Sequence, residues 1–385
     1  MKKILFTPGP SEVEDDVLVE LFKPVIPHYG SEWAELYNRA CDVAGKIFKI
    51  SRGFVTILPV PGAVSIEMAV FNIVESDGDK IVCVSNGFFG ELIERILKLH
   101  GANVLSVKSE WGYPVDVEKL KVVLEENPDA KAVFMVQNET STGTLNDVSS
   151  IAKVVRKHDK LFCIDAISSF GGVEFDFDSW GIDYAIGYAS KCLSGVNGVC
   201  PIAISDRFLQ YVQGRKKPIK SYYFNLPVYI EMSKNIEHPH PTSMPTSVIR
   251  AFYYVASKAL EEGLENRYRR HRRVAKACRA AIKAMNLTLL PKEEYASPTV
   301  TALFIQEGLD KKIISRLSEE HGIVISGGLG KLKGKSLRIG HMGTTANPQY
   351  ILQLVQALEI TLKELGMVEK VGKGTEAAHE ALEKD

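Results

Sequence analysis

Two short apolar runs, each followed by an ionisable residue, constrain the fold of this chain more than any other feature. The run Leu161–Ile164 ends at Asp165, and the run Tyr184–Tyr188 leads to Lys191. Both runs are rich in residues that favour β-strands, and a stretch rich in glycine and serine lies between them. Side chains at the ends of neighbouring strands escape the packed interior, and α/β proteins build their sites there. We therefore expect Asp165 and Lys191 to lie at one edge of a sheet.

Strand-like and helix-like segments alternate over residues 55–204. The expected strands cover residues 55–60, 80–84, 104–107, 132–136, 161–164, 184–188 and 199–204, with helices such as 64–74, 91–100 and 148–158 between them. This alternation predicts an α/β fold with a mainly parallel sheet that helices cover on both faces. After about residue 287 the pattern predicts a smaller α+β unit.

The length of the chain, 385 residues, is enough for two domains that share a large core. We expect an N-terminal arm at 1–15, a large domain at 16–260, a small C-terminal domain at 261–365 and a charged tail at 366–385. Because the tail shows no strong core pattern, we expect it to fray. The basic run at 267–276 is expected to form a solvated helix face, since the chain as a whole carries no net charge.

Composition argues against several classes of protein. The 47 basic and 47 acidic residues balance, so nothing indicates a nucleic acid or an anionic membrane as a partner. The six cysteines are scattered without CxxC pairs, which argues against a metal site and for a reducing compartment. No apolar run is long enough for a membrane span or a signal-peptide core. These features predict a cytoplasmic enzyme.

A partly desolvated lysine beside a carboxylate indicates a specific chemistry. Its amine has a depressed pKa and can form a Schiff base with an aldehyde. The aldehyde cofactor pyridoxal phosphate also needs a carboxylate that keeps its ring nitrogen protonated. Lys191 would hold the aldehyde carbon and Asp165 the ring nitrogen. On spacing alone, an aspartate that caps a turn and a solvated surface lysine are the commoner case.

Several further motifs decide between these two interpretations. They are TPGP (7–10), SNGFFGE (85–91), NETSTG (138–143), IDAISSFGG (164–172), GIDYAIGYASKCLSG (181–195) and GGLGKLKGKSLRIGHMG (327–343). Together they resemble the class V pyridoxal-phosphate aminotransferases, in the family's order and over residues 6 to about 365. They are most similar to the alanine–glyoxylate/serine–pyruvate branch, and DAISSFGG is also similar to 2-aminoethylphosphonate–pyruvate aminotransferases. The resemblance implies the type I fold of pyridoxal-phosphate enzymes and a homodimer with shared active sites.

The resemblance also implies roles for individual residues. Contacts to the cofactor fall on Gly62, Ala63, Val64, Phe89, Thr140, Asp165, Ser190, Lys191, Thr242 and Ser243. Among these, Phe89 would stack on the ring, and the hydroxyls of Thr242 and Ser243 would reach the phosphate in the other subunit. A strand, a turn at Pro61 and Gly62 and a helix that Ala63 opens would by themselves form an anion cradle. Two prolines, Pro59 and Pro61, depart from the family's pattern there and remove N–H donors.

Substrate binding is expected to depend on Arg338, together with Pro8 and Gly9 of the arm. A planar guanidinium on a short strand can clamp an α-carboxylate by two parallel hydrogen bonds. The resemblance implies a ping-pong Schiff-base transfer of an amino group from alanine or serine to glyoxylate or pyruvate. A transaminase for aspartate, phosphoserine or 2-aminoethylphosphonate is a second hypothesis, with Arg52 as a possible second anion ligand. The sequence also leaves open a cysteine desulfurase or lyase on the same fold, and a non-catalytic binding protein.

Overall fold

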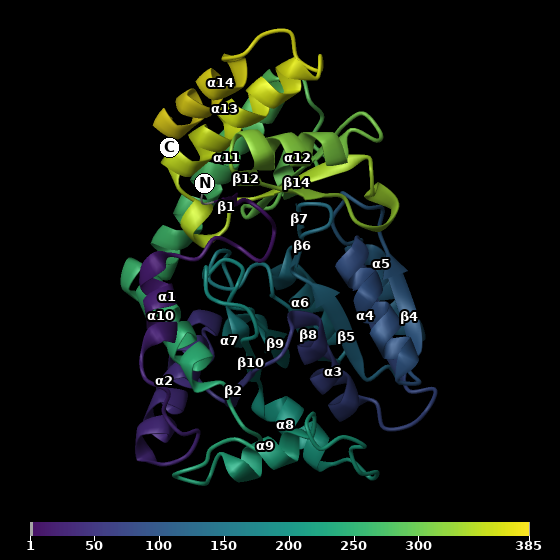
Figure 1. Ribbon diagram of the computed structural model, residues 1–385. Coiled ribbons are helices and arrows are strands. Elements are labelled where there is room, and N and C mark those ends of the chain that lie inside the picture. Colours follow the sequence, from purple (N-terminus) through teal and green to yellow (C-terminus); the bar gives the residue numbers. More distant parts are fainter. Residues whose placement is uncertain (1–2, 385) are drawn as a thin grey trace.

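A computed structural model describes residues 3–384 of the chain, and its centre is a seven-stranded sheet (Figure 1). The strands lie in the order β2-β10-β9-β8-β5-β3-β4. Their bounds are Phe54–Leu58 (β2), Cys200–Ile204 (β10), Tyr184–Ile186 (β9), Leu161–Asp165 (β8), Ala132–Val136 (β5), Lys80–Ser85 (β3) and Asn103–Lys108 (β4). Strands β9, β8, β5, β3 and β4 run parallel to one another, and β10 is antiparallel to both of its neighbours. The predicted mainly parallel sheet is confirmed.

Alternate residues of the central strands pack into two different hydrophobic clusters. In β3, Val82 and Val84 join one cluster, while Ile81 and Cys83 join the other. Successive side chains of a strand point to opposite faces, so the two clusters are the two sides of the sheet. The first side is covered by α2 (Ser31–Phe48), α5 (Val117–Glu126), α6 (Val148–Lys157), α7 (Phe177–Trp180) and α10 (Thr246–Glu262). The second is covered by α3 (Gly62–Ile73), α4 (Phe88–Leu99), α8 (Asp206–Gln213) and α9 (Leu226–Met232).

The C-terminal part of the chain has a cluster and a sheet of its own, drawn in green and yellow in Figure 1. The sheet consists of β11 (Val300–Phe304), β14 (Ser336–Gly340) and β13 (Ser326–Gly327) in that order. Its helices are α11 (Leu264–Ala284), α12 (Asp310–Glu320), α13 (Pro348–Glu364) and α14 (Lys373–Glu383). The short elements are η1 (Glu293–Tyr295), η2 (Gly330–Leu332) and η3 (Gly343–Thr345).

The N-terminal arm joins this C-terminal part rather than the large sheet. Strand β1 (Ile4–Leu5) pairs in parallel with β12 (Ile323–Val324), and the fully buried ring of Phe6 packs in the C-terminal cluster. The arm then passes toward the centre of the molecule, and α1 (Asp15–Phe22) packs against α10. A short hairpin of β6 (Asn138–Glu139) and β7 (Thr144–Leu145) follows β5.

Two sequence expectations are wrong. The tail contains the ordered helix α14, in which Ala378 and Leu382 are buried against the C-terminal cluster. The basic run is also not a wholly solvated face, because Arg267 and His271 are buried. The guanidinium of Arg267 is satisfied inside the protein, since it donates to the carbonyls of Gly171 and Cys192. Within residues 3–384, no helix is long and apolar enough to cross a membrane.

Candidate active site

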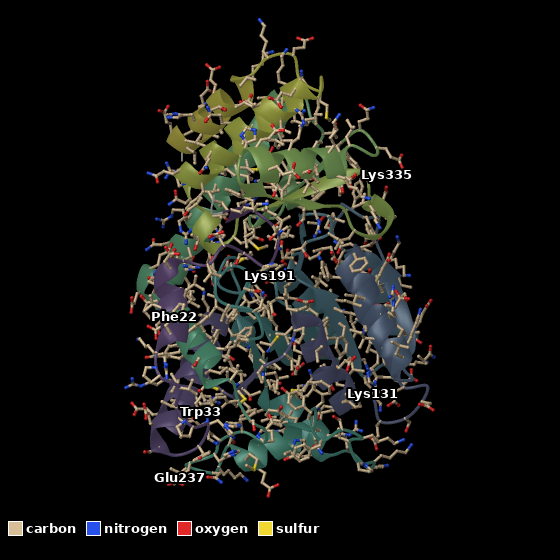
Figure 2. The ribbon with its side chains drawn as sticks, in the orientation of Figure 1. Phe22, Trp33, Lys131, Lys191, Glu237 and Lys335 are labelled. Atoms are coloured by element: carbon tan, nitrogen blue, oxygen red, sulfur yellow. The ribbon has the colours of Figure 1, made fainter. Side chains whose placement is uncertain are left out.

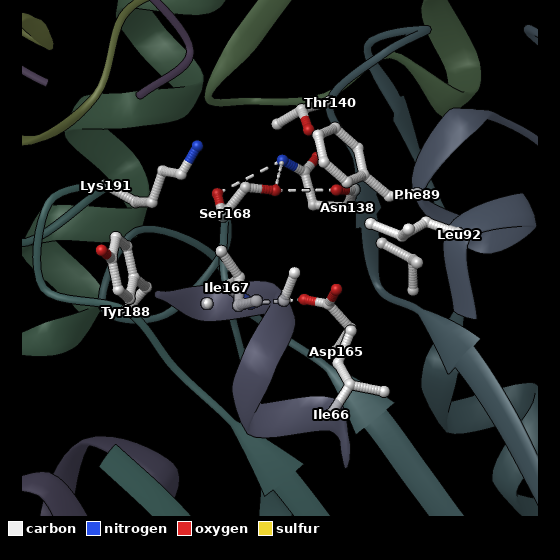
Figure 3. A pocket seen from close by; sticks show the side chains of 13 residues that line it. Ile66, Phe89, Leu92, Asn138, Thr140, Asp165, Ile167, Ser168, Tyr188 and Lys191 are labelled. Carbon is white, nitrogen blue, oxygen red and sulfur yellow. Dashed lines mark hydrogen bonds between the residues drawn. The ribbon is translucent and has the colours of Figure 1, made fainter. Parts of the chain in front are cut away.

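A cavity of about 190 Å³ lies where β5 and β8 end and α3 and α4 begin (Figure 3). It is close to the middle of the molecule, where Lys191 is labelled in Figure 2. The residues that line it are Gly62, Ala63, Ile66, Phe89, Leu92, Val136, Asn138, Thr140, Asp165, Ile167, Ser168, Tyr188 and Lys191. The structure thus brings Asp165 and Lys191 into one cavity, as the strand pattern predicts. Parallel strands deliver both, because β8 ends at Asp165 and the chain after β9 carries Lys191.

Lys191 lines this cavity, and its amine donates a hydrogen bond to the carbonyl of Pro8. The loop that carries it is tied to the arm, because Ser11 donates from its N–H to the carbonyl of Ser190 at 3.0 Å and from its hydroxyl to the carbonyl of Lys191 at 2.7 Å. Burial lowers the pKa of the Lys191 amine to about 8, and the charge of Arg338 adds to this effect. The amine is therefore close to releasing its proton at neutral pH.

Asp165 is buried at the end of β8, and one of its oxygens accepts the N–H of Ile167 at 2.8 Å. Burial raises the pKa of this carboxyl to about 7, although the Ile167 hydrogen bond and the charge of Lys191 oppose the rise. A carboxyl with that pKa gains strongly from a cationic hydrogen-bond donor, since such a donor stabilises its charged form.

The lining combines apolar and aromatic side chains with polar groups, and Thr140 and Asn138 lie close to Phe89 in Figure 3. Phe89 lies on the first turn of α4, and Thr140 follows β6. Asn138 donates through its amide to Ser168 at 2.9 Å, and the Ser168 hydroxyl donates back to the Asn138 carbonyl at 2.7 Å (Figure 3). This pair fixes the ends of two strands relative to each other.

The N-terminus of α3 faces the cavity through Gly62 and Ala63. Its N-cap is Pro61, which provides no side-chain cap, so the first N–H groups of the helix have no capping oxygen from that residue. Pro61 lies before the first helical residue, and its missing N–H therefore leaves the donors of Gly62 and Ala63 intact. Val64 differs, because its N–H donates to the carbonyl of Pro61 at 3.0 Å and its side chain does not line the cavity.

Arg338 lies on β14 and is 8% exposed. Its Nε donates to the carbonyl of Gly327 at 2.9 Å, and Nη1 lies 3.5 Å from the carbonyl of Thr140. Burial lowers the pKa of the guanidinium to about 10, although the charge of Glu139 opposes this shift. No carboxylate of residues 3–384 lies within ion-pair distance of it. A buried guanidinium without an acidic partner in contact is costly unless an anion binds to it.

The arm approaches Lys191 closely at Gly9. A β-carbon at Gly9 would lie 2.0 Å from the Lys191 amine nitrogen, and the φ of Gly9 is +117°. Only glycine fits both the space and the backbone conformation. Pro8 and Gly9 thus contact the lysine directly, which agrees with the predicted position of the arm at the site.

Seven of the predicted site residues are not among those that line the cavity, namely Pro8, Gly9, Val64, Ser190, Thr242, Ser243 and Arg338. The hydroxyl of Ser190 donates to Asn197 at 2.6 Å, while Thr242 is half-buried and Ser243 is exposed in the loop before α10. Arg52 lies in a different cavity, beside α2, and cannot bind a second anion here. Sequence reasoning missed Tyr188, Ile167 and Ser168 as lining residues, although all three fall within motifs that resemble the family.

The lining residues fit pyridoxal phosphate. The cavity contains one amine for an aldehyde, one carboxyl that gains from a cationic ring nitrogen, an aromatic wall and an uncapped helix N-terminus for an anion. The residues do not fit a desulfurase, because none of the six cysteines lines this cavity and five of the six are buried.

Comparisons with known proteins agree with this chemistry. A family model described as aminotransferase class-V matches residues 28–332. An uncharacterised aminotransferase of Methanocaldococcus jannaschii is 34% identical over 100% of this chain and 99% of its own length. The (S)-ureidoglycine–glyoxylate transaminase of Bacillus subtilis is 31% identical, over 99% of this chain and 95% of its own. The crystal structure of the Bacillus enzyme superposes with a TM-score of 0.93, covering 100% of this chain and 98% of that one.

A third similar structure is the alanine–glyoxylate aminotransferase of Nostoc sp., at 27% identity and a TM-score of 0.89 over 94% of this chain and 96% of that one. The matched family region covers most of the chain and includes both Asp165 and Lys191. The protein therefore belongs to the class-V aminotransferases and is a pyridoxal-phosphate-dependent transaminase.

Proposed function

We propose that this transaminase moves an amino group from a small amino acid, alanine or serine, to glyoxylate or pyruvate. The observation that carries the proposal is the buried guanidinium of Arg338, which has no acidic partner in contact among the described residues. It can take one carboxylate. Apart from Lys191, no lysine, arginine or histidine of residues 3–384 lines the cavity, and most of its wall is apolar. Arg338 itself lies on β14 and is not among the lining residues, so a second anionic group inside the cavity would meet only the amine of Lys191.

The relatives' names support glyoxylate as one of the two substrates, while the amino donors that they name differ and include serine and aspartate. The names of the Bacillus and Nostoc enzymes each specify glyoxylate as the acceptor. Aspartate and phosphoserine, the rival donors, carry a second anionic group, and this cavity offers it no partner other than Lys191. We keep glyoxylate first and pyruvate second as acceptors.

Bound pyridoxal phosphate supplies an electrophilic carbon and an electron-withdrawing ring. In our proposal Gly62 and Ala63 donate N–H groups to its phosphate, Phe89 packs on the ring, and Asp165 accepts the ring N–H. Arg338 orients the substrate carboxylate, which places the α-proton toward the amine of Lys191. Because the pKa of that amine is about 8, it can accept this proton and return one near neutral pH. Pro8 and Gly9 close the cavity above the lysine.

We also propose that the chain works as a homodimer in the cytoplasm. Large apolar side chains are exposed near α1 and in the loop before α10, with Phe22 at 87%, Val25 at 79% and Ile236 at 84% exposure. Patches of this kind are covered in stable assemblies. The same loop carries Thr242 and Ser243, which lie outside the cavity of their own chain and are the candidates to reach the phosphate in the other subunit. Six unpaired cysteines support a reducing compartment.

A donor and acceptor panel tests the proposed substrates. Purified protein loaded with pyridoxal phosphate is assayed with alanine, serine, aspartate, phosphoserine and 2-aminoethylphosphonate, each with glyoxylate and with pyruvate. We expect kcat/KM to be highest for alanine or serine with glyoxylate. A tenfold preference for aspartate or phosphoserine would refute the proposed substrate class, because it requires a second anion site that the cavity lacks. Arg338→Met serves as the control that separates enzymatic from background transfer.

A further inference from the structure

The first turn of α4, which carries Phe89, is held by a carboxylate from another part of the chain. Glu139 is fully buried, and it lies between Asn138 and Thr140, which both line the cavity. Successive side chains of an extended segment point to opposite sides, so Glu139 points away from the cavity and toward α4. The local N-cap of α4, Gly87, provides no side-chain cap.

Glu139 and its neighbour Ser141 satisfy three N–H groups at the start of α4. One oxygen of Glu139 accepts the N–H of Phe89 and the N–H of Gly90, each at 3.1 Å. Its other oxygen accepts the N–H and the hydroxyl of Ser141, at 3.1 and 2.5 Å. The Ser141 hydroxyl in turn accepts the N–H of Phe88 at 2.9 Å. A negative charge at a helix N-terminus also interacts favourably with the helix dipole.

The side chain of Glu139 is tightly packed against Gly87. A β-carbon at Gly87 would lie 2.3 Å from both Cγ and Cδ of Glu139. The φ of Gly87 is −177°, which any residue adopts, so the glycine is required by the space that the glutamate occupies and not by its backbone. All four groups that face the carboxylate of Glu139 are N–H or O–H donors. A glutamine at this position would keep one acceptor oxygen and would turn its NH₂ group, itself a donor, toward two of them.

We propose that Glu139 is a positioning residue of the active site, which anchors the start of α4 and thereby fixes Phe89 against the ring of the cofactor. The inference rests on the proposed contact between Phe89 and that ring. Glu139 does not line the cavity, and it holds Phe89 through the main chain of Phe89 and Gly90, while its charge also raises the pKa of Asp165, as burial does, and opposes the lowering of the pKa of Arg338 by burial.

The chain offers a matched control in Glu359 on α13. This glutamate is also fully buried, and it accepts the N–H of Gly374 at 2.5 Å and the N–H and hydroxyl of Thr375 at 3.1 and 2.6 Å. It therefore caps α14 in the way that Glu139 caps α4, but it lies on a helix of the C-terminal part and does not line the cavity. A purely structural role for Glu139 predicts the same phenotype for Glu139→Gln and Glu359→Gln.

The test compares Glu139→Gln, Glu359→Gln and the wild-type chain in two ways. The first is titration of the cofactor-free protein with pyridoxal phosphate, followed by visible circular dichroism of the bound cofactor, which reports how the ring is held. The second is amide hydrogen exchange of the cofactor-free protein. We expect Glu139→Gln to weaken cofactor binding about tenfold and to lower the dichroism, because charged hydrogen bonds are lost. Its exchange should rise at Phe89 and Gly90.

Glu359→Gln should raise exchange at Gly374 and leave cofactor binding and dichroism at wild-type values. If Glu139→Gln does not fold, Gly87→Ala displaces the same carboxylate from the other side and should weaken binding in the same direction. Wild-type affinity and dichroism in a folded Glu139→Gln variant, or equal losses in Glu359→Gln, would overturn the proposal. Unchanged exchange at Phe89 would overturn the anchoring itself, whether or not the cofactor contact with Phe89 is correct. A wild-type chain that bound no pyridoxal phosphate would instead overturn the assignment of the site.

Discussion

Replacing Lys191 by methionine is expected to make the cofactor-free protein more stable at pH 7 while it abolishes transamination. Burial and the charge of Arg338 lower the pKa of the amine from 10.5 to about 8. The folded protein therefore carries an ammonium that would be more stable in the unfolded chain. Methionine keeps most of the length of the side chain and has no charge to desolvate.

The size of the effect follows from the two pKa values. A difference between 10.5 and about 8 corresponds to roughly 3 kcal/mol. Lys191 as a whole residue is only half-buried, so solvent reaches part of the side chain and we discount the value to about 2 kcal/mol. Loss of the hydrogen bond to the Pro8 carbonyl offsets about 1 kcal/mol. A neutral amine also donates this bond, so the offset stays constant with pH.

The dependence on pH has a definite sign. Below pH 8 the amine is protonated in both the folded and the unfolded chain, and the folded wild type bears the full cost. Between pH 8 and 10.5 the folded chain has released the proton while the unfolded chain still holds it, so wild-type stability rises with pH. The Lys191→Met variant lacks this rise. Its advantage over the wild type should therefore shrink by about 2 kcal/mol across that window.

Urea unfolding of the cofactor-free proteins at several pH values from 7 to 10.5 measures this difference directly. Lys312→Met, at an exposed lysine of α12, is the matched control and should show no trend of this kind. A stability difference between wild type and Lys191→Met that stays constant from pH 8 to 10.5 would refute the argument. So would a variant that is less stable than the wild type at pH 7.

Three further predictions concern the substrate clamp, the arm and the C-terminal helix. Arg338→Met should lower kcat/KM for the amino acid roughly a hundredfold with unchanged affinity for pyridoxal phosphate, measured by steady-state kinetics and cofactor titration. Gly9→Ala should lower kcat at least tenfold in a folded protein, because the added carbon overlaps the Lys191 amine, and wild-type kcat would contradict this contact. Leu382→Ala should lower the free energy of unfolding by about 2–3 kcal/mol in denaturant titrations, since the buried leucine holds α14, whereas a frayed tail would show no change.

The pairing of Asp165 with Lys191 could be predicted from the sequence because it depends on short-range rules. Asp165 ends one strand, Lys191 follows the next, and parallel neighbours end at the same edge of a sheet. The positions of the central strands along the chain could be predicted for the same reason, since their apolar runs have the length and composition of buried strands. The place of the arm at Pro8 and Gly9 could be predicted only through the resemblance of its motif.

The errors concern residues whose environment is set by distant parts of the chain. Helix α14 has a charged sequence, and only its contacts with α11 and α13 bury Ala378 and Leu382. The guanidinium of Arg267 pairs with Glu262 five residues away, and it is buried because carbonyls 75 and 96 residues away accept its other protons. A pattern within one segment contains no information about such partners, so a basic run and a charged tail are predicted to be solvated.

The two helix N-termini beside the cavity also differ because of residues that are distant in the sequence. Both α3 and α4 follow a strand of one sheet, and each begins at or just after a glycine, so either could serve as an anion cradle. In the structure, Glu139 and Ser141 already satisfy the first N–H groups of α4, and a second anion there would meet a carboxylate. Gly62 and Ala63 of α3 have no such cap from Pro61 and face the cavity. In our proposal the phosphate therefore binds at α3, because a glutamate about 50 residues away already caps α4, and replacing that glutamate would change which helix can bind an anion.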